Sequence, residues 1–413
     1  MGVSLFLTSG KVNPAYLKLD LFCRGMTIDE SASVGEDGRA ILRTRAGLGS
    51  GLETLIPPNF YTNVPVLEPW ARKSPYRLHK EAGRYLIRRE GEFVTEVSLP
   101  PPPRFYNQRT SSGKPMASIG VLQGTYLGIY PGEVCHFWQT QPRSNCHFCS
   151  VGLNVGDKDA REKTVQDVLE TVRAARREVG ITFVHFNTGY YEGDTCLDAV
   201  EPFVQAVVRE TGLLVGVQCP PHPDPTRYDR LRALGVNNVS FCLELWDDER
   251  FREVCPGKSR TIGKERYLEA IRYCARRFDT TNGEIIAGLE APEKTIEAIE
   301  WITGQGAIPT VCVFRPVVGS DYEDVPPPRT EEMVPVFARF YEACMERGLP
   351  VGIAPNVKVS IVLLPEESRW LSPRAEAWRW RRVKLAAMRT AFGLYFRARL
   401  SKRATRSETL EGR

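Results

Sequence analysis

Three cysteines lie close together in a segment that is too polar for a protein core. Ten residues separate Cys135 from Cys146, and Cys146 and Cys149 form a C-x-x-C pair. Three thiolates can hold a [4Fe–4S] cluster and leave one iron without a protein ligand, where a small molecule can bind and be reduced. A structural zinc site would need a fourth ligand, for which His136 and His147 are candidates. The residues favour a cluster, with structural zinc and unligated buried thiols as the alternatives.

Polar residues on predicted strands point to a second part of the same site. Ser240, Cys242 and Glu244 fall on one face of a predicted strand, because side chains alternate along a strand. Polar side chains on an inward face call for a ligand or a partner group. We expect these residues on the face of the barrel where the loops after the strands form the active site.

The elements that would position these residues alternate regularly after about residue 120. Alternating strands and helices predict parallel strands with helical crossovers, which curl into a barrel when the crossovers are right-handed. The expected fold class is therefore α/β: a partial (β/α)6 TIM-type barrel with a β-rich N-terminal extension and a helical C-terminal extension. A doubly wound open sheet is the alternative, although no Gly-x-Gly-x-x-Gly follows the first strand. The predicted strands are 126–130, 181–187, 213–218, 236–243, 284–289 and 308–314, and the predicted helices are 160–179, 197–208, 228–234, 264–277, 293–304 and 331–347.

Three parts of the chain are expected from these patterns. They are a mixed, β-leaning N-terminal domain over 1–115, the partial barrel over 116–362, and a basic helical extension and tail over 363–413. In the first part, residues 85–95 predict a hairpin with its turn at 90–92. The last part combines aromatic residues with many arginines. It indicates an amphipathic helix that either covers the barrel with its arginine stems or binds a membrane surface or a partner.

Composition excludes several classes of protein. The 413 residues are 42% apolar and 25% charged, as in ordinary soluble proteins, and a net charge of +5 is too small and dispersed to favour nucleic acid as a partner. No run of 18 apolar residues exists, so no transmembrane segment is expected, and residues 1–10 lack the regions of a signal peptide. The 11 cysteines are therefore expected to be reduced thiols of a cytoplasmic protein.

The cysteine spacing resembles a known signature. Cys146-x-Phe148-Cys149 is similar to the second half of the radical SAM motif C-x-x-x-C-x-Φ-C, in which Φ is aromatic. The first gap departs from that motif, since ten residues stand where it has three. The resemblance covers about residues 120–320 and is to the branch of biotin synthase and the hydrogenase maturases. It implies that Cys135, Cys146 and Cys149 bind a [4Fe–4S] cluster as the catalytic residues, with Phe148 beside the cofactors.

The same resemblance assigns contacts with S-adenosylmethionine (SAM) to residues at successive strand ends. Thr188, Gly189 and Glu192 match the element that contacts the SAM amino group, and Glu244 matches the residue that binds its ribose. The carboxylate-binding position falls on a lysine, which lacks the bidentate geometry of arginine. The positions that match the carboxylate and adenine contacts are Lys264 with Arg266 nearby, Ile286, Gly288, Arg315 and Pro316.

The resemblance implies an enzyme that cleaves SAM reductively and uses the resulting 5′-deoxyadenosyl radical to abstract hydrogen from a small-molecule substrate. An electron donor such as flavodoxin or ferredoxin is implied as a partner. Arg252, Lys258, Arg260 and Arg315 would suit an anionic substrate. Two alternatives are a sulfur-inserting enzyme of the biotin or lipoyl synthase type and a zinc-stabilised, non-catalytic α/β protein. The first would carry an auxiliary cluster, for which Cys219, Cys242, Cys255 and Cys312 are the candidates.

Overall fold

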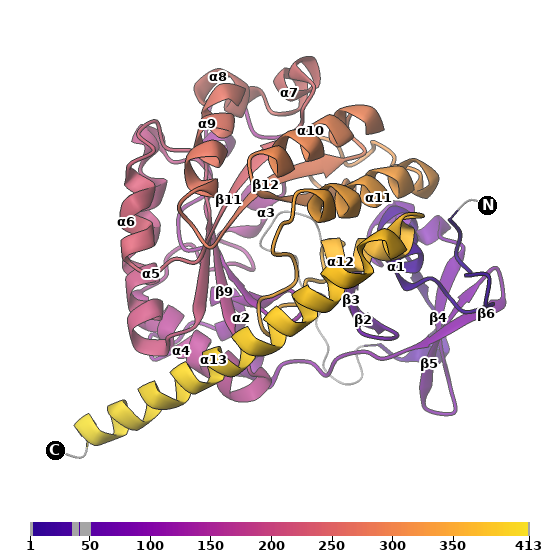
Figure 1. Ribbon diagram of the computed structural model, residues 1–413, viewed down its shortest axis with the longest axis horizontal. Helices are drawn as coiled ribbons and strands as arrows, with labels where there is room; N and C mark the ends of the chain where they lie inside the picture. Colours follow the sequence, from indigo (N-terminus) through magenta and orange to yellow (C-terminus); the bar gives the residue numbers. More distant parts are fainter. Residues whose placement is uncertain (1–2, 35–40, 42–50, 412–413) are drawn as a thin grey trace.

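A single seven-stranded sheet forms the centre of the molecule in the computed structural model, which describes residues 3–34, 41 and 51–411. Strands β8 to β13 lie side by side in chain order and are parallel, and β7 adds an antiparallel edge next to β8. The sheet curls into a half-barrel with helices on its outer side (Figure 1). This confirms the predicted fold class. The strands are β7 Val121–Leu122, β8 Leu127–Ile129, β9 Phe183–Asn187, β10 Leu214–Gln218, β11 Asn238–Glu244, β12 Thr280–Ala287 and β13 Ile308–Val313.

Helices follow the strands as the alternation predicts. Helix α4 shows why its boundaries lie where they do: Thr164 caps the Asp167 amide at 3.1 Å, and the Asp167 carboxylate accepts from the Thr164 amide at 2.9 Å. Gly180 ends the helix with φ +66°, which suits glycine. The helices of the barrel are α2 Met116–Ile119, α3 Val151–Asn154, α4 Val165–Val179, α5 Cys196–Thr211, α6 Arg227–Ala233, α7 Asp248–Val254, α8 Pro256–Thr261, α9 Lys264–Ala275, α10 Pro292–Gly304 and α11 Thr330–Glu346.

The side-chain alternation of the parallel strands separates a helix-covered face from an inner face. On β9 and β10 the apolar residues Val184, Phe186, Val215 and Val217 are fully buried. The alternate positions line an internal cavity, which is described below. Because a strand turns successive side chains to opposite faces, one short strand serves both the core and the cavity.

The N-terminal part contains more helix than its sequence pattern predicts. A four-stranded sheet with the order β1-β4-β5-β6 lies beside a β2–β3 hairpin, and the turn between β5 and β6 confirms the predicted hairpin. Helix α1, which was not predicted, is buried around almost its whole circumference. The elements are α1 Pro14–Arg24, β1 Thr27–Ile28, β2 Leu52–Ile56, β3 Phe60–Val64, β4 Tyr76–Glu81, β5 Arg84–Arg89 and β6 Glu92–Val97.

The C-terminal part closes the open side of the half-barrel and then forms one long helix. The backbone of residues 358–360 bonds both to the barrel edge, where the Thr125 amide donates to the Lys358 carbonyl at 3.1 Å, and to β3, where the Asn63 amide donates to the Ser360 carbonyl at 2.8 Å. Helix α12 spans Pro365–Ser368 and α13 spans Arg379–Glu411. None of the helices in the described residues combines the length and the apolar character needed to cross a bilayer. Short 3-10 turns, η1 to η7, cover Glu30–Ala32, Pro69–Lys73, Arg104–Asn107, His136–Trp138, Glu192–Asp194, Arg369–Leu371 and Ala375–Trp378.

A buried ion pair ties the two ends of the chain together. The Lys18 ammonium on α1 lies 2.8 Å from the Glu367 carboxylate on α12, and the two side chains are 0% and 4% exposed. Lys18 also donates to the Val359 carbonyl at 3.0 Å. Burial lowers the pKa of Lys18 and raises that of Glu367, so each charge depends on its partner.

Replacing Lys18 with methionine removes one half of this pair. Because a buried charge that loses its partner costs about 3–5 kcal/mol, we expect Lys18→Met to lower the free energy of unfolding by about 3 kcal/mol in urea titrations. The variant Lys18→Met/Glu367→Gln, which also removes the stranded carboxylate, should recover more than half of the loss. Equal losses in both variants would contradict this role of the pair.

Candidate functional site

The three predicted cysteines occupy one long loop that follows β8. Cys146 is buried, Cys135 and Cys149 are half-buried, and all three are free thiols. The charge of Cys146 raises the pKa of Cys135, and the charges of Cys146 and Cys135 raise the pKa of Cys149, so the three side chains lie near one another. The structure therefore brings together the three residues that the sequence singled out.

The ten residues between Cys135 and Cys146 form a compact turn. The Ser144 amide donates to the Phe137 carbonyl at 3.0 Å, and the Thr140 and Ser144 hydroxyls lie 2.9 Å apart. The Phe137 ring stacks on Tyr190 with a centroid separation of 4.8 Å and an interplanar angle of 6°. The unusual gap thus forms a folded excursion that packs against the loop after β9.

Backbone hydrogen bonds hold the cysteine loop against three other strand-end loops. Each bond joins a peptide group of the cysteine loop with a peptide group that follows β9, β11 or β13. Such bonds fix the loop independently of any side chain. They run from the His136 amide to the Tyr190 carbonyl at 2.8 Å, from the His147 amide to Val254 at 2.9 Å, from the Gly257 amide to Ser144 at 2.9 Å, and from the Tyr322 amide to His147 at 3.1 Å.

Gly189 leaves no room for a side chain beside Cys135. A Cβ atom at this position would lie 2.5 Å from the Cys135 Cβ and 2.7 Å from the Tyr130 hydroxyl oxygen. The Gly189 amide donates to that hydroxyl at 3.0 Å. Close approach of two backbones is a role that glycine alone can fill without a shift of its neighbours.

The donor set fits an iron–sulfur cluster. Burial raises the pKa of Cys135 to about 11 and that of Cys149 to about 12, so both thiols hold their protons until a metal displaces them. The Val151 amide points at the Cys149 sulfur over 3.4 Å, and hydrogen bonds of this kind stabilise cluster thiolates. Over the described ranges, no three His, Cys, Asp or Glu side chains are placed to share a single metal ion.

A fourth thiol, Cys255, contacts this group. A hydrogen bond from the Cys255 thiol lowers the pKa of Cys146, while burial raises the pKa of Cys255 itself. The sequence suggested Cys255 only as part of an auxiliary cluster. The structure does not bring those four candidates together, because Cys219 contacts Cys196, whereas Cys242 and Cys312 lie near Glu284.

The predicted SAM contacts after β9 and β11 lie near the cysteine loop. Thr188 follows β9 and bonds to the Gln218 carbonyl at 2.9 Å, whereas Glu192 is exposed on η5. Glu244 ends β11, is buried, and forms an ion pair with Lys258. Its φ of +70° is uncommon outside glycine, and residues held in such conformations cluster at functional sites.

The other predicted contacts have partners within the protein. Lys264 pairs with Asp248 at 2.8 Å, and Arg266 pairs with Asp194 at 3.1 Å. Arg315 is directed at the N-terminal part, where it donates to the Asn63 carbonyl at 3.1 Å. Of the remaining predicted contacts, Phe148 is half-buried, Ile286 is buried, Gly288 has φ +102° and packs against Pro328, and the Pro316 carbonyl accepts from the Trp70 indole at 3.0 Å.

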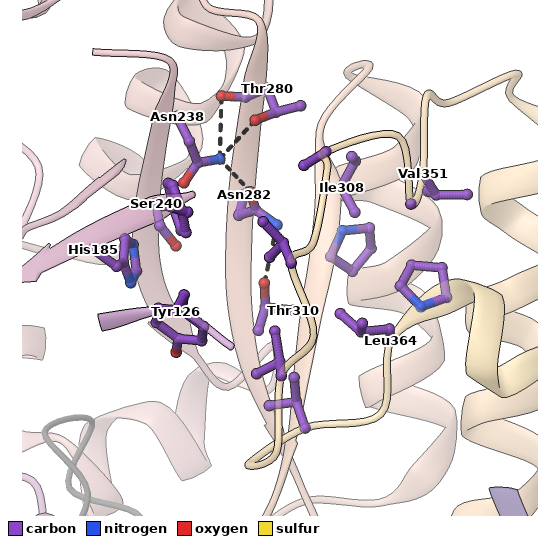
Figure 2. Close-up of a pocket in the computed structure, with 18 of the residues that line it drawn as sticks. Tyr126, His185, Asn238, Ser240, Thr280, Asn282, Ile308, Thr310, Val351 and Leu364 are labelled. Carbon is purple, nitrogen blue, oxygen red and sulfur yellow. Dashed lines mark hydrogen bonds between the residues drawn. The ribbon is translucent and has the colours of Figure 1, made fainter. Parts of the chain in front are cut away.

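A cavity of about 600 Å³, partly open to solvent, lies inside the half-barrel. One wall consists of the inner-face side chains of the strands, which are mostly polar and uncharged, and the other is the apolar segment 350–365 (Figure 2). Asn238 donates to the Asn282 side chain at 2.7 Å, and Asn282 donates to the Thr310 hydroxyl at 3.0 Å, so a ladder of hydrogen bonds crosses three strands. The described lining residues include no lysine and no arginine.

A network around Glu284 connects the cavity with the cysteine loop. The Ser240 hydroxyl donates to the Glu284 carboxylate at 2.6 Å, and Gln218 bonds to the same carboxylate and to the Cys242 sulfur. Burial raises the pKa of Glu284 to about 7. Lys258 donates to the Cys242 backbone carbonyl at 3.1 Å and pairs with Glu244, and the charges of this pair act on the pKa of Cys146.

Sequence reasoning missed two members of this network, Gln218 and Glu284, and a histidine that lines the same cavity. His185, Gln218 and Glu284 all line the cavity, and burial lowers the pKa of His185 to about 4, so its ring is neutral. A usable signal was present, because each is a polar residue at an inward position of a predicted strand. The inward face formed by Ser240 and Cys242 was predicted on that ground.

The comparisons with known proteins identify a family match in the same region. Residues 141–302 match the family described as the radical SAM superfamily, a range that includes Cys146 and Cys149 and begins after Cys135. The bacteriochlorophyllide c C-7(1)-hydroxylase of Chlorobaculum limnaeum is 32% identical over 117 residues, which are 28% of this chain and 29% of that protein. The chain thus matches less than a third of that curated relative.

Similar solved structures include two enzymes. Methylornithine synthase (PylB) superposes with a TM-score of 0.42 and 20% identity, covering 53% of this chain and 62% of that chain. The [FeFe]-hydrogenase maturase HydG from Carboxydothermus hydrogenoformans superposes with a TM-score of 0.44 and 17% identity, covering 54% of this chain and 52% of that chain.

The raised pKa of Glu284 predicts a pH dependence of stability. Since its pKa rises from 4.5 to about 7 on folding, the folded protein keeps a proton that the unfolded chain releases, and this contribution to stability falls as pH rises through that window. Glutamine cannot lose a proton, so the melting temperature of Glu284→Gln should increase relative to the parent protein between pH 5 and about pH 8.

A matched control is Glu346→Gln, because arginine partners lower the pKa of Glu346 and keep it ionised throughout that window. Its melting temperature relative to the parent should stay constant from pH 5 to about pH 8. If the melting temperatures of Glu284→Gln and the parent changed with pH in the same way, Glu284 would be ionised in the folded protein from pH 5 to about pH 8, against the prediction.

Proposed function

Because residues 141–302 form a radical SAM domain, we propose that this enzyme holds its [4Fe–4S] cluster on Cys135, Cys146 and Cys149 and abstracts hydrogen from a small molecule bound in the half-barrel cavity. The family is one of enzymes whose cofactors are a [4Fe–4S] cluster and SAM. The observation that carries the proposal is the convergence of three free thiols in the loop after β8, joined by side chains to the cavity.

A cluster held by Cys135, Cys146 and Cys149 would, with SAM and a reductant such as flavodoxin or ferredoxin, supply radical abstraction of hydrogen from the substrate. The protein contributes position and exclusion of water. Gly189 lets the loop after β9 approach Cys135, and Glu244 sits at the end of β11, close to Cys146. We propose that Thr188, Gly189 and Glu244 contact SAM, as the family resemblance implies.

The cavity sets the class of substrate. One wall offers amide and hydroxyl groups, the other is apolar, and the charged groups of the described lining are acidic apart from the neutral His185. A neutral or cationic molecule with one polar and one apolar side fits such a lining. Of the four cations that suggested an anionic substrate, Lys258 pairs with Glu244 and Arg315 donates to the Asn63 carbonyl. Arg252 and Arg260 are exposed and are not among the described residues that line the cavity.

A second candidate is the hydroxylation of a tetrapyrrole. The 117 residues shared with the bacteriochlorophyllide c hydroxylase favour it. Reconstituted enzyme, SAM, a reductant and bacteriochlorophyllide c would give a hydroxylated pigment under this candidate, detectable by mass spectrometry. Release of 5′-deoxyadenosine without any modified pigment would reject this substrate and leave the proposed SAM chemistry standing.

Iron analysis tests the ligand set. We expect about four irons per chain after anaerobic reconstitution, formation of 5′-deoxyadenosine with SAM and dithionite, and loss of most iron in Cys135→Ala, Cys146→Ala and Cys149→Ala. Cys344→Ala is the matched control, since Cys344 is a buried thiol on α11 outside this loop. Six to eight irons would favour an auxiliary cluster, and full iron in Cys135→Ala would remove that residue from the ligand set.

Gly189→Ala tests the close packing beside Cys135. Its new methyl group would meet Cys135 and Tyr130, so we expect reconstituted iron to fall by at least half and 5′-deoxyadenosine formation to fall about tenfold or more. Gly304→Ala on α10 is the control, because a Cβ there meets nothing within 4 Å. Full iron in the Gly189 variant would show that the loop tolerates a shift.

A further inference from the structure

We propose that the exposed face of helix α13 docks this enzyme on an anionic lipid bilayer. The face is an apolar stripe formed by Trp380, Val383, Ala387, Ala391 and Leu394, which recur at helical spacing. Trp380 is 81% exposed and Leu394 is 57% exposed. This surface is separate from the proposed chemistry, and its test does not depend on the substrate.

Exposed apolar side chains gather on α13, both in the stripe and next to it. Ten large hydrophobic side chains of the described residues are exposed, and five of them lie on α13 between residues 380 and 395. Single exposed hydrophobic residues are ordinary, whereas a contiguous group marks a site of interaction. The five are Trp380, Val383, Met388, Leu394 and Tyr395.

The opposite face of α13 already has a partner. Leu385 and Phe396 are buried, and Arg399 donates to the Gly212 carbonyl at the end of α5 at 2.7 Å. In Figure 1 the helix runs along the outside of the half-barrel, and its C-terminal end extends past the body. The stripe therefore points away from the protein, and packing within the chain does not explain it.

The positive charge of α13 indicates which kind of partner binds the stripe. Residues 379–401 contain seven lysines and arginines and no aspartate or glutamate. Arg379 and Arg397 flank the stripe, Lys384 lies within it, and all three are exposed. Cations around an apolar stripe with a tryptophan are the pattern of helices that lie in the interface of anionic membranes.

Other occupants fit less well. A second copy of the chain would place the same cations against each other, which costs free energy without an intervening anion. A nucleic acid would match the cations but would leave the valine, leucine and tryptophan of the stripe without apolar partners. An anionic bilayer satisfies both parts, because its headgroups pair with the cations and its acyl region receives the stripe.

Helix α13 also borders the cavity. Phe392 lines it, together with the apolar segment 350–365, and its ring lies 6.2 Å from that of the buried Phe396. The helix that faces the lipid thus contributes to the apolar side of the cavity. An amphipathic substrate dissolved in the membrane would meet this side of the enzyme.

Flotation with vesicles tests the proposal on the full chain. We expect the protein to float with vesicles of phosphatidylcholine containing about 30% phosphatidylglycerol, to float weakly with phosphatidylcholine alone, and to be released by high salt. Trp380→Ser/Leu394→Ser should lower the bound fraction about tenfold, and Arg379→Gln/Lys384→Gln should lower it at least fivefold on anionic vesicles. Formation of 5′-deoxyadenosine in solution should be unchanged in both.

Matched controls change exposed residues of the same kinds elsewhere on the surface. Leu67→Ser/Phe93→Ser removes two hydrophobic side chains that are 55% and 54% exposed, and Arg72→Gln/Lys73→Gln removes two exposed cations. Both controls should float like the parent. Absence of flotation, equal losses in control and stripe variants, or a dimer that Trp380→Ser/Leu394→Ser converts to monomer would overturn the proposal.

Discussion

The site depends on a small set of peptide hydrogen bonds that hold one loop against three others. Thiols on a free loop would spread apart, since conformational entropy opposes their convergence. Here the groups next to Cys135 and Cys146 are bonded to the loops after β9, β11 and β13, which are themselves fixed by a parallel sheet. The ordering cost of this loop is therefore met during folding, by backbone hydrogen bonds that do not depend on the cysteine side chains.

Two buried ion pairs also fix the positions of parts of the chain. Lys258 and Glu244 form a buried pair between the cysteine loop and the cavity, and Lys18 and Glu367 form another between the chain ends. Such pairs add little net stability but penalise arrangements that separate their partners. Both therefore specify position, one at the strand end nearest the thiols and the other at the closure of the half-barrel.

The sequence predicted the repeating part of the fold well, because strand and helix periods are local properties. All six parallel strands and the six helices α4, α5, α6, α9, α10 and α11 were located, whereas the short helices α3, α7 and α8 were not predicted. The spacing of three cysteines identified the loop after β8. The first residues of β12, Thr-Thr-Asn-Gly, were missed because polar residues at cavity-facing positions resemble a turn. Helix α1 was missed because burial on all sides removes the polar face that marks a helix.

Pairings between distant residues were beyond local patterns. Arg315 follows β13 in a motif that suggested a SAM contact, yet its side chain turns to the carbonyl of Asn63, some 250 residues earlier in the chain. Cys255 was one of eleven cysteines, and its contact with Cys146 depends on how the α7–α8 turn packs against the cysteine loop. Such contacts depend on the assembled fold and produce no periodic pattern in the sequence.

The order of the cavity walls along the chain has a consequence for synthesis. The strands that form the polar wall end by residue 313, whereas the apolar wall is made by residues 350–365. A ribosome therefore releases the cysteine loop and all six parallel strands before the segment that covers their interior. During that interval the inner face is exposed to water. Its amide and hydroxyl side chains can be hydrated there until residues 350–365 are synthesised and cover them.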